Sequence, residues 1–209
     1  MLTFNKSFFD NIVGICLKAG HAILEEYEKP LTKISLKEDS SPVTEADLRA
    51  DDIIVTNLVK LDKSIPCISE ESSGDYNFSD EKLFWAVDPL DGTKEFIEKT
   101  GDFTVNIGLI SNKQPIFGIV YAPVLDKIWL GFIDNDNKKN ESFRYEQVTK
   151  HKYPLTNSKK NLVDIPSTEI NILTSRVHHS PKTKVWLERQ FRHKKTKITQ
   201  RGSSIKICL

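Results

Sequence analysis

The stretch Leu83–Phe96 reads LFWAVDPLDGTKEF, and it decides the fold class. Its first five residues, Leu83–Val87, are all apolar, and such a run predicts a strand that is buried on both faces. The run leads directly into Asp88–Asp91 and then into Gly92–Thr93, where a helix is predicted over residues 93–99. Because ligands bind at strand ends in mixed α/β sheets, this junction is the first candidate site.

The turn after the strand carries hard oxygen donors. Asp88 and Asp91 lie three residues apart, and the carbonyl of Leu90 between them can turn inward. Two carboxylates and a carbonyl suit Mg²⁺ rather than zinc. The free N–H groups of Gly92 and Thr93 at a helix start, with the helix dipole behind them, attract phosphate. This combination predicts metal-assisted phosphoryl chemistry.

Two other interpretations of this turn compete with a metal site. A plain aspartate-capped turn needs one carboxylate and leaves the second one, the proline and the Gly-Thr pair unexplained. The motif D-x-D-G-T of aspartyl-phosphate phosphatases sets its nucleophile and its acid two residues apart. Here the spacing is three residues and position 89 is proline, so we favour the metal and phosphate site.

Further carboxylates are expected near the turn. The predicted strand in IPCISEES ends in two glutamates, Glu70 and Glu71. As a third carboxylate, Glu70 would complete one metal site and help bridge to a second, roughly 3.5–4 Å away. The segment Thr44–Asp47 has the shape of a capping box. Two roles are therefore open for Asp47: it caps its helix, or it works with the Thr93 hydroxyl to orient and activate a metal-bound water.

Periodicity places the other elements around this site. Apolar residues at helical spacing predict a helix over about residues 5–28 and a second from about Thr44 to about Leu61. Strands are expected in FTVNIGLI, in two segments of PIFGIVYAPVLDKIWLGFI around a turn at residues 123–126, in INILTS and in TKIT. Helices are expected over residues 181–193 and in GSSIKICL.

Composition narrows the class of protein. The 209 residues are enough for one domain, or for one domain with a subdomain. Thirty basic and 29 acidic residues give a formal charge of +1, which favours a small-molecule substrate over nucleic acid. The basic cluster at residues 193–197 is interpreted as solvated surface. The composition leaves the oligomeric state open.

The cysteines and the apolar runs bear on location. Cys16, Cys67 and Cys208 are odd in number and widely spaced, which favours a reduced cytoplasm over a disulfide framework or a zinc site. The N-terminal apolar run is too short and too interrupted for a signal peptide or a membrane span. We expect a cytoplasmic protein without an integral membrane segment, with peripheral attachment at the inner face of the membrane as an alternative.

The predicted elements indicate an α/β (α+β) fold in two parts. Residues 1–135 form the metal- and phosphate-binding α/β part, and residues 136–209 form a partial C-terminal α/β subdomain. Leu209 ends the chain about two turns into an apolar helix without a cap. We interpret this as a chain shorter than the complete fold, and a short frayed terminal helix is the alternative.

Several of these motifs resemble one family. SPVTEAD, SEES, DPLDGTKEFI and FTVNIGLI follow in the order of the inositol monophosphatase superfamily of Mg²⁺-dependent, lithium-sensitive phosphatases. DPLDGTKEF, followed by FTVNI, YAPV and GSSIK, is most similar to its CysQ branch, the 3'(2'),5'-bisphosphate nucleotidases. The resemblance covers nearly the whole chain and implies a layered αβαβα sandwich of the inositol monophosphatase and sugar phosphatase type, with its C-terminal part incomplete.

The resemblance also implies a set of metal ligands. Glu70, Asp88 and the Leu90 carbonyl bind the first metal. Asp88 and Asp91 serve the second, and Glu70 can help to hold a third, so that two or three Mg²⁺ ions are implied. Glu70, Leu90 and Asp91 are in addition expected close to the substrate, and Glu70 is expected among the catalytic residues.

The remaining implied roles concern the water and the substrate. Thr93, paired with Asp47, activates the water, and the Gly92 and Thr93 amides hold the scissile phosphate. Four further positions match residues that approach the nucleotide in the nucleotidase branch: Ser175, His178, Gly202 and Lys206. The segment TSRVHHS departs from the usual arginine-serine-histidine pattern, so the choice between His178 and His179 stays open.

One motif of the family is missing. The family carries a late tryptophan-aspartate pair whose aspartate completes the second metal site, and none of the three tryptophans here precedes an aspartate. Losing even an outer partner of a metal commonly costs about 10–100-fold. The implied function is Mg²⁺-dependent hydrolysis of 3'(2')-phosphoadenosine 5'-phosphate to AMP and phosphate by a metal-activated water. The alternatives are hydrolysis of inositol phosphates, and a truncated, catalytically inactive remnant.

Overall fold

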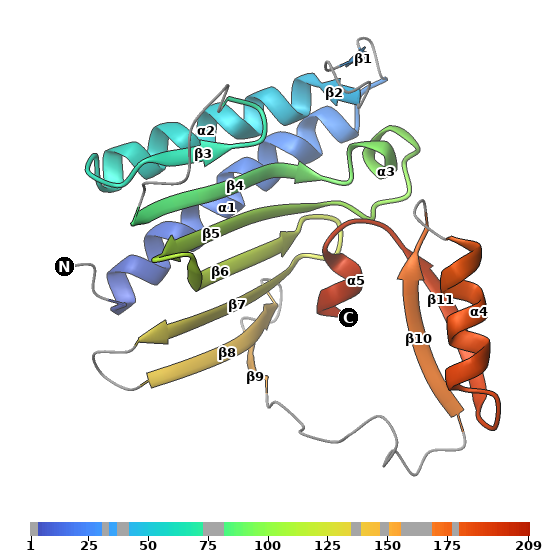
Figure 1. The fold of residues 1–209 in the computed structure, drawn as a ribbon. Helices are drawn as coiled ribbons and strands as arrows, with labels where there is room; N and C mark the ends of the chain where they lie inside the picture. Colours follow the sequence, from blue (N-terminus) through green and yellow to red (C-terminus); the bar gives the residue numbers. More distant parts are fainter. Residues whose placement is uncertain are drawn as a thin grey trace.

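A seven-stranded sheet with two helices on one face forms the main body of the molecule (Figure 1). The computed structural model describes residues 4–30, 34–36, 42–72, 82–134, 139–146, 151–155, 169–176 and 180–209. The covering helices are α1 (Lys6–Tyr27) and α2 (Glu45–Leu61). The strands lie in chain order: β3 (Cys67–Ser69), β4 (Leu83–Asp91), β5 (Thr104–Ser111), β6 (Gln114–Ala122), β7 (Lys127–Asp134), β8 (Lys139–Glu146) and β9 (His151–Pro154).

A second, smaller sheet stands beside the main body. Strands β10 (Glu169–Ser175) and β11 (Lys195–Arg201) run parallel, and α4 (Pro181–Gln190) makes the crossover that a parallel pair needs. Between the two sheets lies α5 (Ile205–Cys208), whose Ile205 packs on Ala122 and Trp129 of the main sheet (Figure 1). The order of layers is helix, sheet, helix, sheet, helix, so the predicted α/β sandwich is confirmed.

Shorter elements complete the described residues. Strands β1 (Ile34–Leu36) and β2 (Pro42–Thr44) form an antiparallel pair before α2, and α3 (Thr93–Ile97) follows β4. The division of the chain into residues 1–135 and 136–209 stays a prediction. In the described part of the chain, β8 and β9 pair with β7 in the main sheet, and β10 and β11 make a sheet of their own.

Packing of α1 and α2 on the main sheet forms the hydrophobic core. Of the apolar α1 residues at helical spacing, five are buried and Tyr27 is half-buried; the buried ones are Phe8, Ile12, Cys16, Ala19 and Ile23. The alternating set of β5 and the residue before it is buried throughout: Phe103, Val105, Ile107 and Leu109. Full burial of one such large apolar side chain contributes about 1.5–3 kcal/mol. Helical and strand periodicity therefore located the core.

Strand β4 differs from its prediction in burial and in length. Trp85 and Val87 are buried, but Phe84 and Ala86 are only half-buried. The prediction of burial on both faces was wrong because α1 and α2 cover only one face of the main sheet (Figure 1). The strand also continues through the aspartates to Asp91 instead of ending at Val87.

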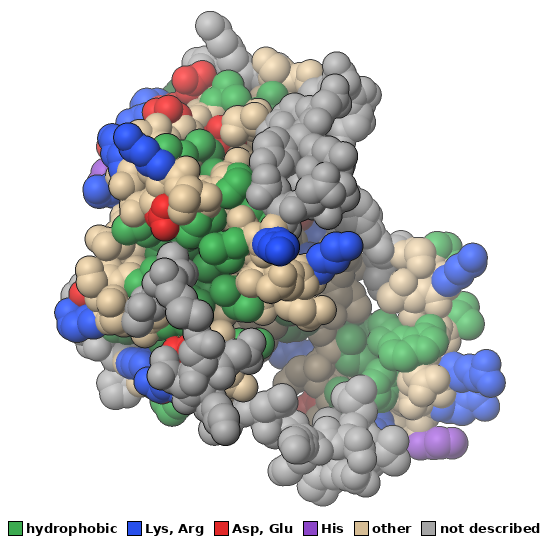
Figure 2. All heavy atoms as spheres, turned by 60° about the vertical axis from the view of Figure 1, so that its left-hand side comes forward, with side chains coloured by type: hydrophobic (Ala, Val, Ile, Leu, Met, Phe, Trp, Pro, Cys, Tyr) green, Lys and Arg blue, Asp and Glu red, His purple; other side chains and the backbone are tan. Residues whose placement is uncertain are grey.

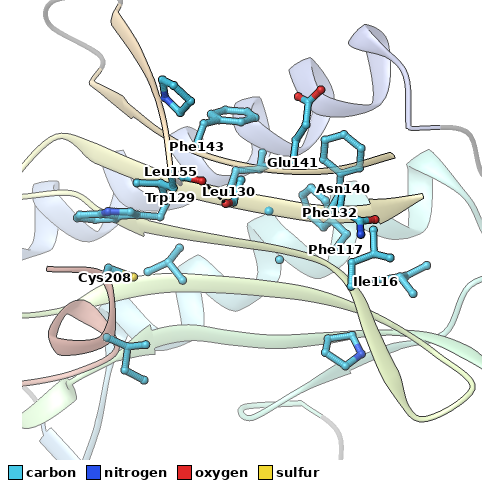
Figure 3. A pocket seen from close by; sticks show the side chains of 18 of the residues that line it. Ile116, Phe117, Trp129, Leu130, Phe132, Asn140, Glu141, Phe143, Leu155 and Cys208 are labelled. Carbon is cyan, nitrogen blue, oxygen red and sulfur yellow. Dashed lines mark hydrogen bonds between the residues drawn. The ribbon is translucent and has the colours of Figure 1, made fainter. Parts of the chain in front are cut away.

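An apolar groove of about 970 Å³ lies along β6, β7 and β8 next to α5. Figure 3 shows Trp129, Leu130 and Phe143 around it, with Cys208 at one end. Figure 2 shows hydrophobic side chains gathered in the middle of the face of the molecule that it views. The described residues that line the groove include no member of the predicted metal or phosphate site, which lies at the end of β4.

Candidate active site

A β-bulge at the end of β4 explains the two aspartates and the proline between them. Asp88 pairs with Asn106 of β5, and Asp91 pairs with Thr104, so four residues of β4 stand opposite three of β5. In a regular strand, residues three apart point to opposite faces. Because of the one extra residue, Asp88 and Asp91 stand opposite Asn106 and Thr104, which are two residues apart on β5. Asp88 and Asp91 therefore point toward the same side of the sheet.

Four carboxyl groups meet beside this bulge. Glu70 follows β3 directly, its N–H donates to Val87 O over 3.0 Å, and its side chain is in hydrogen-bond contact with Asp88. Burial raises the pKa of Asp88 to about 8, and the charges of Asp91, Glu70 and Asp47 act in the same direction. Without a cation, the cluster therefore holds a proton that a solvated carboxylate would release.

The donors of this cluster fit a divalent metal by their chemistry. Asp88 Oδ1 is buried and has no hydrogen-bond partner among the described residues, and mutually repelling carboxylates are the groups that a hard cation stabilises. Among the described residues, no three acidic, histidine or cysteine side chains already surround one point. The residues present thus supply suitable ligands and charge, without a preformed coordination shell.

Asp91 is oriented by two residues to which sequence reasoning gave no role. Its Oδ2 accepts from the Ser204 N–H at 2.5 Å and from the Ser204 hydroxyl at 2.6 Å. The same oxygen accepts from Asn106 Nδ2 at 3.3 Å. The signals that could have found them were a polar amide within an apolar strand, for Asn106, and the second serine of GSSIK, for Ser204.

Asp47 caps its helix and also contacts Thr93, while its role in activating a water stays a prediction. Its Oδ2 accepts from the Thr44 N–H at 2.8 Å and from the Thr44 hydroxyl at 2.6 Å, which confirms the capping box of α2. Its Oδ1 accepts from the Thr93 hydroxyl at 2.9 Å. Burial raises the pKa of Asp47, while its hydrogen bonds with Thr44 and Thr93 lower it. The carboxylate is therefore both a helix cap and the acceptor for Thr93.

Gly92 occupies a position that only glycine fills without strain. Its φ of 99° lies in the left-handed region, and a Cβ there would stand 2.9 Å from Asp102 O and 3.1 Å from Ser203 Cβ. Gly92 is also the N-cap of α3, without a side-chain cap. The helix that was predicted over residues 93–99 is α3, which is only five residues long. An anion bound at its start would therefore depend on individual N–H groups rather than on a helix dipole.

The predicted nucleotide-binding residues lie across the second sheet. Ser175 ends β10 and pairs with Arg201 at the end of β11, and Gly202 follows directly. The ammonium group of Lys206 in α5 donates a hydrogen bond to Ser203 O at 2.5 Å. These residues gather at the carboxyl ends of the parallel pair, and the Ser204 contact joins them to Asp91. His178 lies outside the described residues.

Comparison with known proteins identifies the family. The model of the Inositol monophosphatase family matches residues 5–209. The chain belongs to the inositol monophosphatase family. A curated relative, the "3'(2'),5'-bisphosphate nucleotidase CysQ" of Buchnera aphidicola, is 38% identical over an alignment of 209 positions that covers 98% of this chain and 71% of the relative. The protein of the same name from Escherichia coli K12 is 35% identical over 96% of this chain and 75% of its own length.

A solved structure shares the fold. The crystal structure of CysQ from Bacteroides thetaiotaomicron matches with a TM-score of 0.73 and 30% identity, and covers 99% of this chain and 76% of that one. That CysQ is described as a bacterial member of the inositol monophosphatase family. The family is generally metal-dependent, in agreement with the acidic cluster at β4. None of the helices in the described ranges is long and apolar enough to cross a membrane.

Proposed function

We propose that the chain is a Mg²⁺-dependent phosphomonoesterase that removes the 3'- or 2'-phosphate of a nucleoside 3'(2'),5'-bisphosphate. The observation that carries the proposal is the bulge of β4, which turns Asp88 and Asp91 to one side next to Glu70, within reach of the Thr93–Asp47 pair. The names of the CysQ relatives support the substrate class. We further propose 3'-phosphoadenosine 5'-phosphate as substrate, with AMP and phosphate as products.

The metal site in this proposal is formed by Glu70, Asp88, Asp91 and the Leu90 carbonyl. Carboxylate and carbonyl oxygens are the ligands that Mg²⁺ takes in proteins, and two or three ions would offset the charge of this cluster. When bound, the ions supply positive charge that polarises the phosphate and lowers the pKa of nearby water. The carboxylates in turn need the Ser204 and Asn106 contacts, because these orient Asp91.

The residues around the metal position the reacting groups. Thr93 donates its proton toward Asp47, which leaves the lone pairs of the hydroxyl oxygen free to accept a hydrogen bond from a water. The N–H groups of Gly92 and Thr93 hold the scissile phosphate. The water oxygen bonds to phosphorus as the bond from phosphorus to the ribose oxygen breaks. The water proton moves toward Asp47 through Thr93, and the ribose oxygen leaves protonated by solvent.

The rest of the substrate extends across the second sheet in this proposal. Ser175, Gly202 and Lys206 lie at the carboxyl ends of β10 and β11 or in the turn of α5 that follows. The Lys206 ammonium would bind the phosphate that is not cleaved, and the His178 of the sequence motif would approach the nucleotide. A substrate with one phosphate lacks the group that Lys206 binds.

Phosphate release by the purified chain tests the proposal. The substrates are 3'-phosphoadenosine 5'-phosphate and inositol 1-phosphate, each with Mg²⁺ and with or without lithium, and Asp88→Asn is the matched inactive variant. Lithium-sensitive release from the nucleotide, abolished in Asp88→Asn, is the expected result. Preference for inositol 1-phosphate would mean that inositol phosphates are the substrate class instead. Release from neither substrate, or release that persists in Asp88→Asn, would overturn the proposal.

Location is a separate part of the proposal. All three cysteines are free, and burial raises the pKa of each thiol, that of Cys67 to about 12 and that of Cys208 to about 11. Unpaired thiols support the reducing cytoplasm expected from the sequence. Fractionation of cells that express the chain should place it in the cytoplasmic fraction, and recovery with washed membranes would instead favour the peripheral attachment.

A further inference from the structure

A buried carboxylate outside the proposed catalytic set holds the second sheet on the main body. The side chain of Asp102 is 3% exposed and accepts from two arginines. Arg176 Nη2 lies 2.7 Å from its Oδ2, and Arg201 Nη1 lies 2.8 Å from its Oδ1. The Gly202 N–H is a third donor, 3.3 Å from Oδ2. A carboxylate this deeply buried needs such donors, because an unpaired charge there would be costly.

The partners of Asp102 come from both strands of the second sheet. Asp102 itself lies between α3 and β5 of the main body, Arg176 directly follows β10, and Arg201 ends β11. The Arg176 N–H also donates to Arg201 O over 3.2 Å, so the ends of the two strands are joined to each other. One carboxylate of the main body thus fixes the end of the second sheet that faces the candidate active site.

The residues that follow Arg201 lead straight to the proposed metal ligand Asp91. We call Gly202–Ser204 the 202–204 segment. At its first residue, the N–H binds Asp102. At its last residue, the N–H and the hydroxyl both bind Asp91. Two carboxylates of the main body therefore hold the two ends of a three-residue segment.

The conformation of the 202–204 segment depends on being held in this way. Ser203 has a φ of 45°, in the left-handed region that a non-glycine residue adopts only at a cost of about 1–3 kcal/mol. A Cβ on Gly202 would stand 2.5 Å from Glu95 Cγ and closer still to the Glu95 carboxyl group, which is itself buried. Contacts at both ends must therefore over-determine the segment, as such a backbone requires.

We propose that Asp102 is a positioning residue for the active site, which acts through the 202–204 segment. By binding Arg201 and the Gly202 N–H, Asp102 fixes the position of Ser204 relative to Asp91. Ser204 in turn orients the Asp91 carboxylate. The inference rests on the proposed function in one respect, the role of Asp91 as a metal ligand. Groups that orient a metal ligand commonly change metal affinity or activity by about 10–100-fold when they are lost.

The first experiment measures the Ser204 amide without any metal. Hydrogen exchange of the Ser204 N–H is followed by NMR in the metal-free chain and in Asp102→Asn, which keeps the shape of the side chain and removes its charge. We expect exchange at Ser204 to become at least about 10-fold faster, while core amides of β5 keep their rates. Unchanged exchange at Ser204 would overturn the proposal whether or not the chain binds a metal.

The second experiment measures the Mg²⁺ dissociation constant by calorimetry on the substrate-free chain. Asp102→Asn is expected to weaken Mg²⁺ binding about 10-fold or more. Ser204→Ala should weaken it as well. The double variant Asp102→Asn/Ser204→Ala should lose less than the sum of the two single effects, because both changes act on the contact between Ser204 and Asp91, of which alanine keeps only the N–H. Additive effects, or a Mg²⁺ affinity equal to that of the unchanged chain, would refute a positioning role and leave Asp102 a purely structural residue.

Two further variants separate positioning from folding. The double variant Asp102→Asn/Arg201→Gln removes a cation together with the anion, so it leaves less unpaired charge if Asp102→Asn alone does not fold. Glu25→Gln is the matched control, since it removes the charge of a carboxylate that accepts from Arg49 at 2.7 Å between α1 and α2, and it should change neither Ser204 exchange nor Mg²⁺ affinity. If the unchanged chain itself binds no Mg²⁺, the proposed function fails, whereas the exchange experiment still decides the role of Asp102.

Discussion

The Thr93 hydroxyl donates to Asp47 Oδ1 over 2.9 Å, and the other oxygen of Asp47 is occupied at the start of α2. One carboxylate thus connects the N-terminus of α2 to the first residue of α3, 46 residues further along the chain. Because each oxygen serves one partner, the two roles of Asp47 do not compete. Removal of the Thr93 hydroxyl should therefore affect the chemistry and leave the helix cap intact.

Thr93→Val is predicted to lower phosphate release by at least about 100-fold, the contribution typical of a positioned proton acceptor. Valine has the shape of threonine without its hydroxyl, and Asp47 keeps both of its bonds to Thr44. The thermal midpoint should stay close to that of the unchanged chain. Initial rates with 3'-phosphoadenosine 5'-phosphate and a melting curve measure the two effects.

The matched control for this variant lies on α2. Thr56→Val removes a hydroxyl that donates to Asp52 Oδ1 over 3.4 Å on the exposed side of the helix. It should leave the rate unchanged. A Thr93→Val chain as active as Thr56→Val would show that Thr93 takes no part in the reaction.

Local rules account for what the sequence could predict. The capping box at Thr44–Asp47, the spacing of the α1 core residues and the alternation of β5 all depend on neighbours within a few turns or residues. The interpretation of the β4 turn as a site depended on donor chemistry and on the place of the turn directly after an apolar strand. Each of these features depends only on residues that lie close together in the sequence.

Contacts between distant segments were not predictable in this way. Ser204 meets Asp91 across 113 residues, and Asp102 meets Arg201 across 99. Both contacts depend on how the second sheet is placed against the main body, which no local periodicity specifies. The bulge that turns Asp88 and Asp91 to one side is likewise a property of the pairing with β5. Pro89 indicated an irregularity in the strand, but it did not indicate which β5 residues Asp88 and Asp91 pair with.

Asp88→Asn is predicted to stabilise the metal-free chain while it removes metal binding. The pKa of Asp88, about 8, lies above the ordinary carboxyl value of about 3.9, so the folded chain holds a proton that the unfolded chain releases. Between about pH 4 and pH 8 the free energy of unfolding therefore falls as pH rises, and above about pH 8 the loss is complete. Asparagine at position 88 cannot ionise, so the variant does not lose this part of its free energy of unfolding as pH rises.

Melting curves in a chelating buffer from about pH 5 to about pH 9 measure this effect. At the high end, Asp88→Asn should be more stable by at least about 1 kcal/mol, which for a chain of this size raises the midpoint by roughly 2–4 °C. Asp52→Asn changes an exposed aspartate and should follow the unchanged chain at every pH. Parallel curves for Asp88→Asn and the unchanged chain would mean that Asp88 is already ionised at neutral pH.

Lys206→Met is predicted to raise KM for the bisphosphate about 10–100-fold and to leave hydrolysis of a substrate with one phosphate unchanged. A charge-assisted hydrogen bond contributes about 1.5–3 kcal/mol, and methionine keeps most of the apolar stem. The control Lys197→Met removes an exposed lysine of β11 and should change neither value. An equal rise of KM for both substrates would place Lys206 at the scissile phosphate instead.

Two glycines of α1 should respond in opposite ways to the same substitution. A Cβ on Gly20 would stand 2.8 Å from Tyr121 Cδ1, closer still to Tyr121 Cε1, and 3.2 Å from Pro123 Cγ. Tyr121 is buried on β6, so its ring cannot turn away freely. A Cβ on Gly14 would meet no atom of the described residues within 4 Å.

Gly20→Ala is therefore predicted to destabilise the chain by about 1–3 kcal/mol, because it forces α1 away from β6. Gly14→Ala is predicted to stabilise it by about 0.5–1 kcal/mol, because alanine loses less conformational freedom in a helix than glycine does. Urea denaturation of both variants measures the difference, and each serves as the control for the other. If Gly20→Ala were as stable as Gly14→Ala, the close approach of α1 to Tyr121 would not exist in solution.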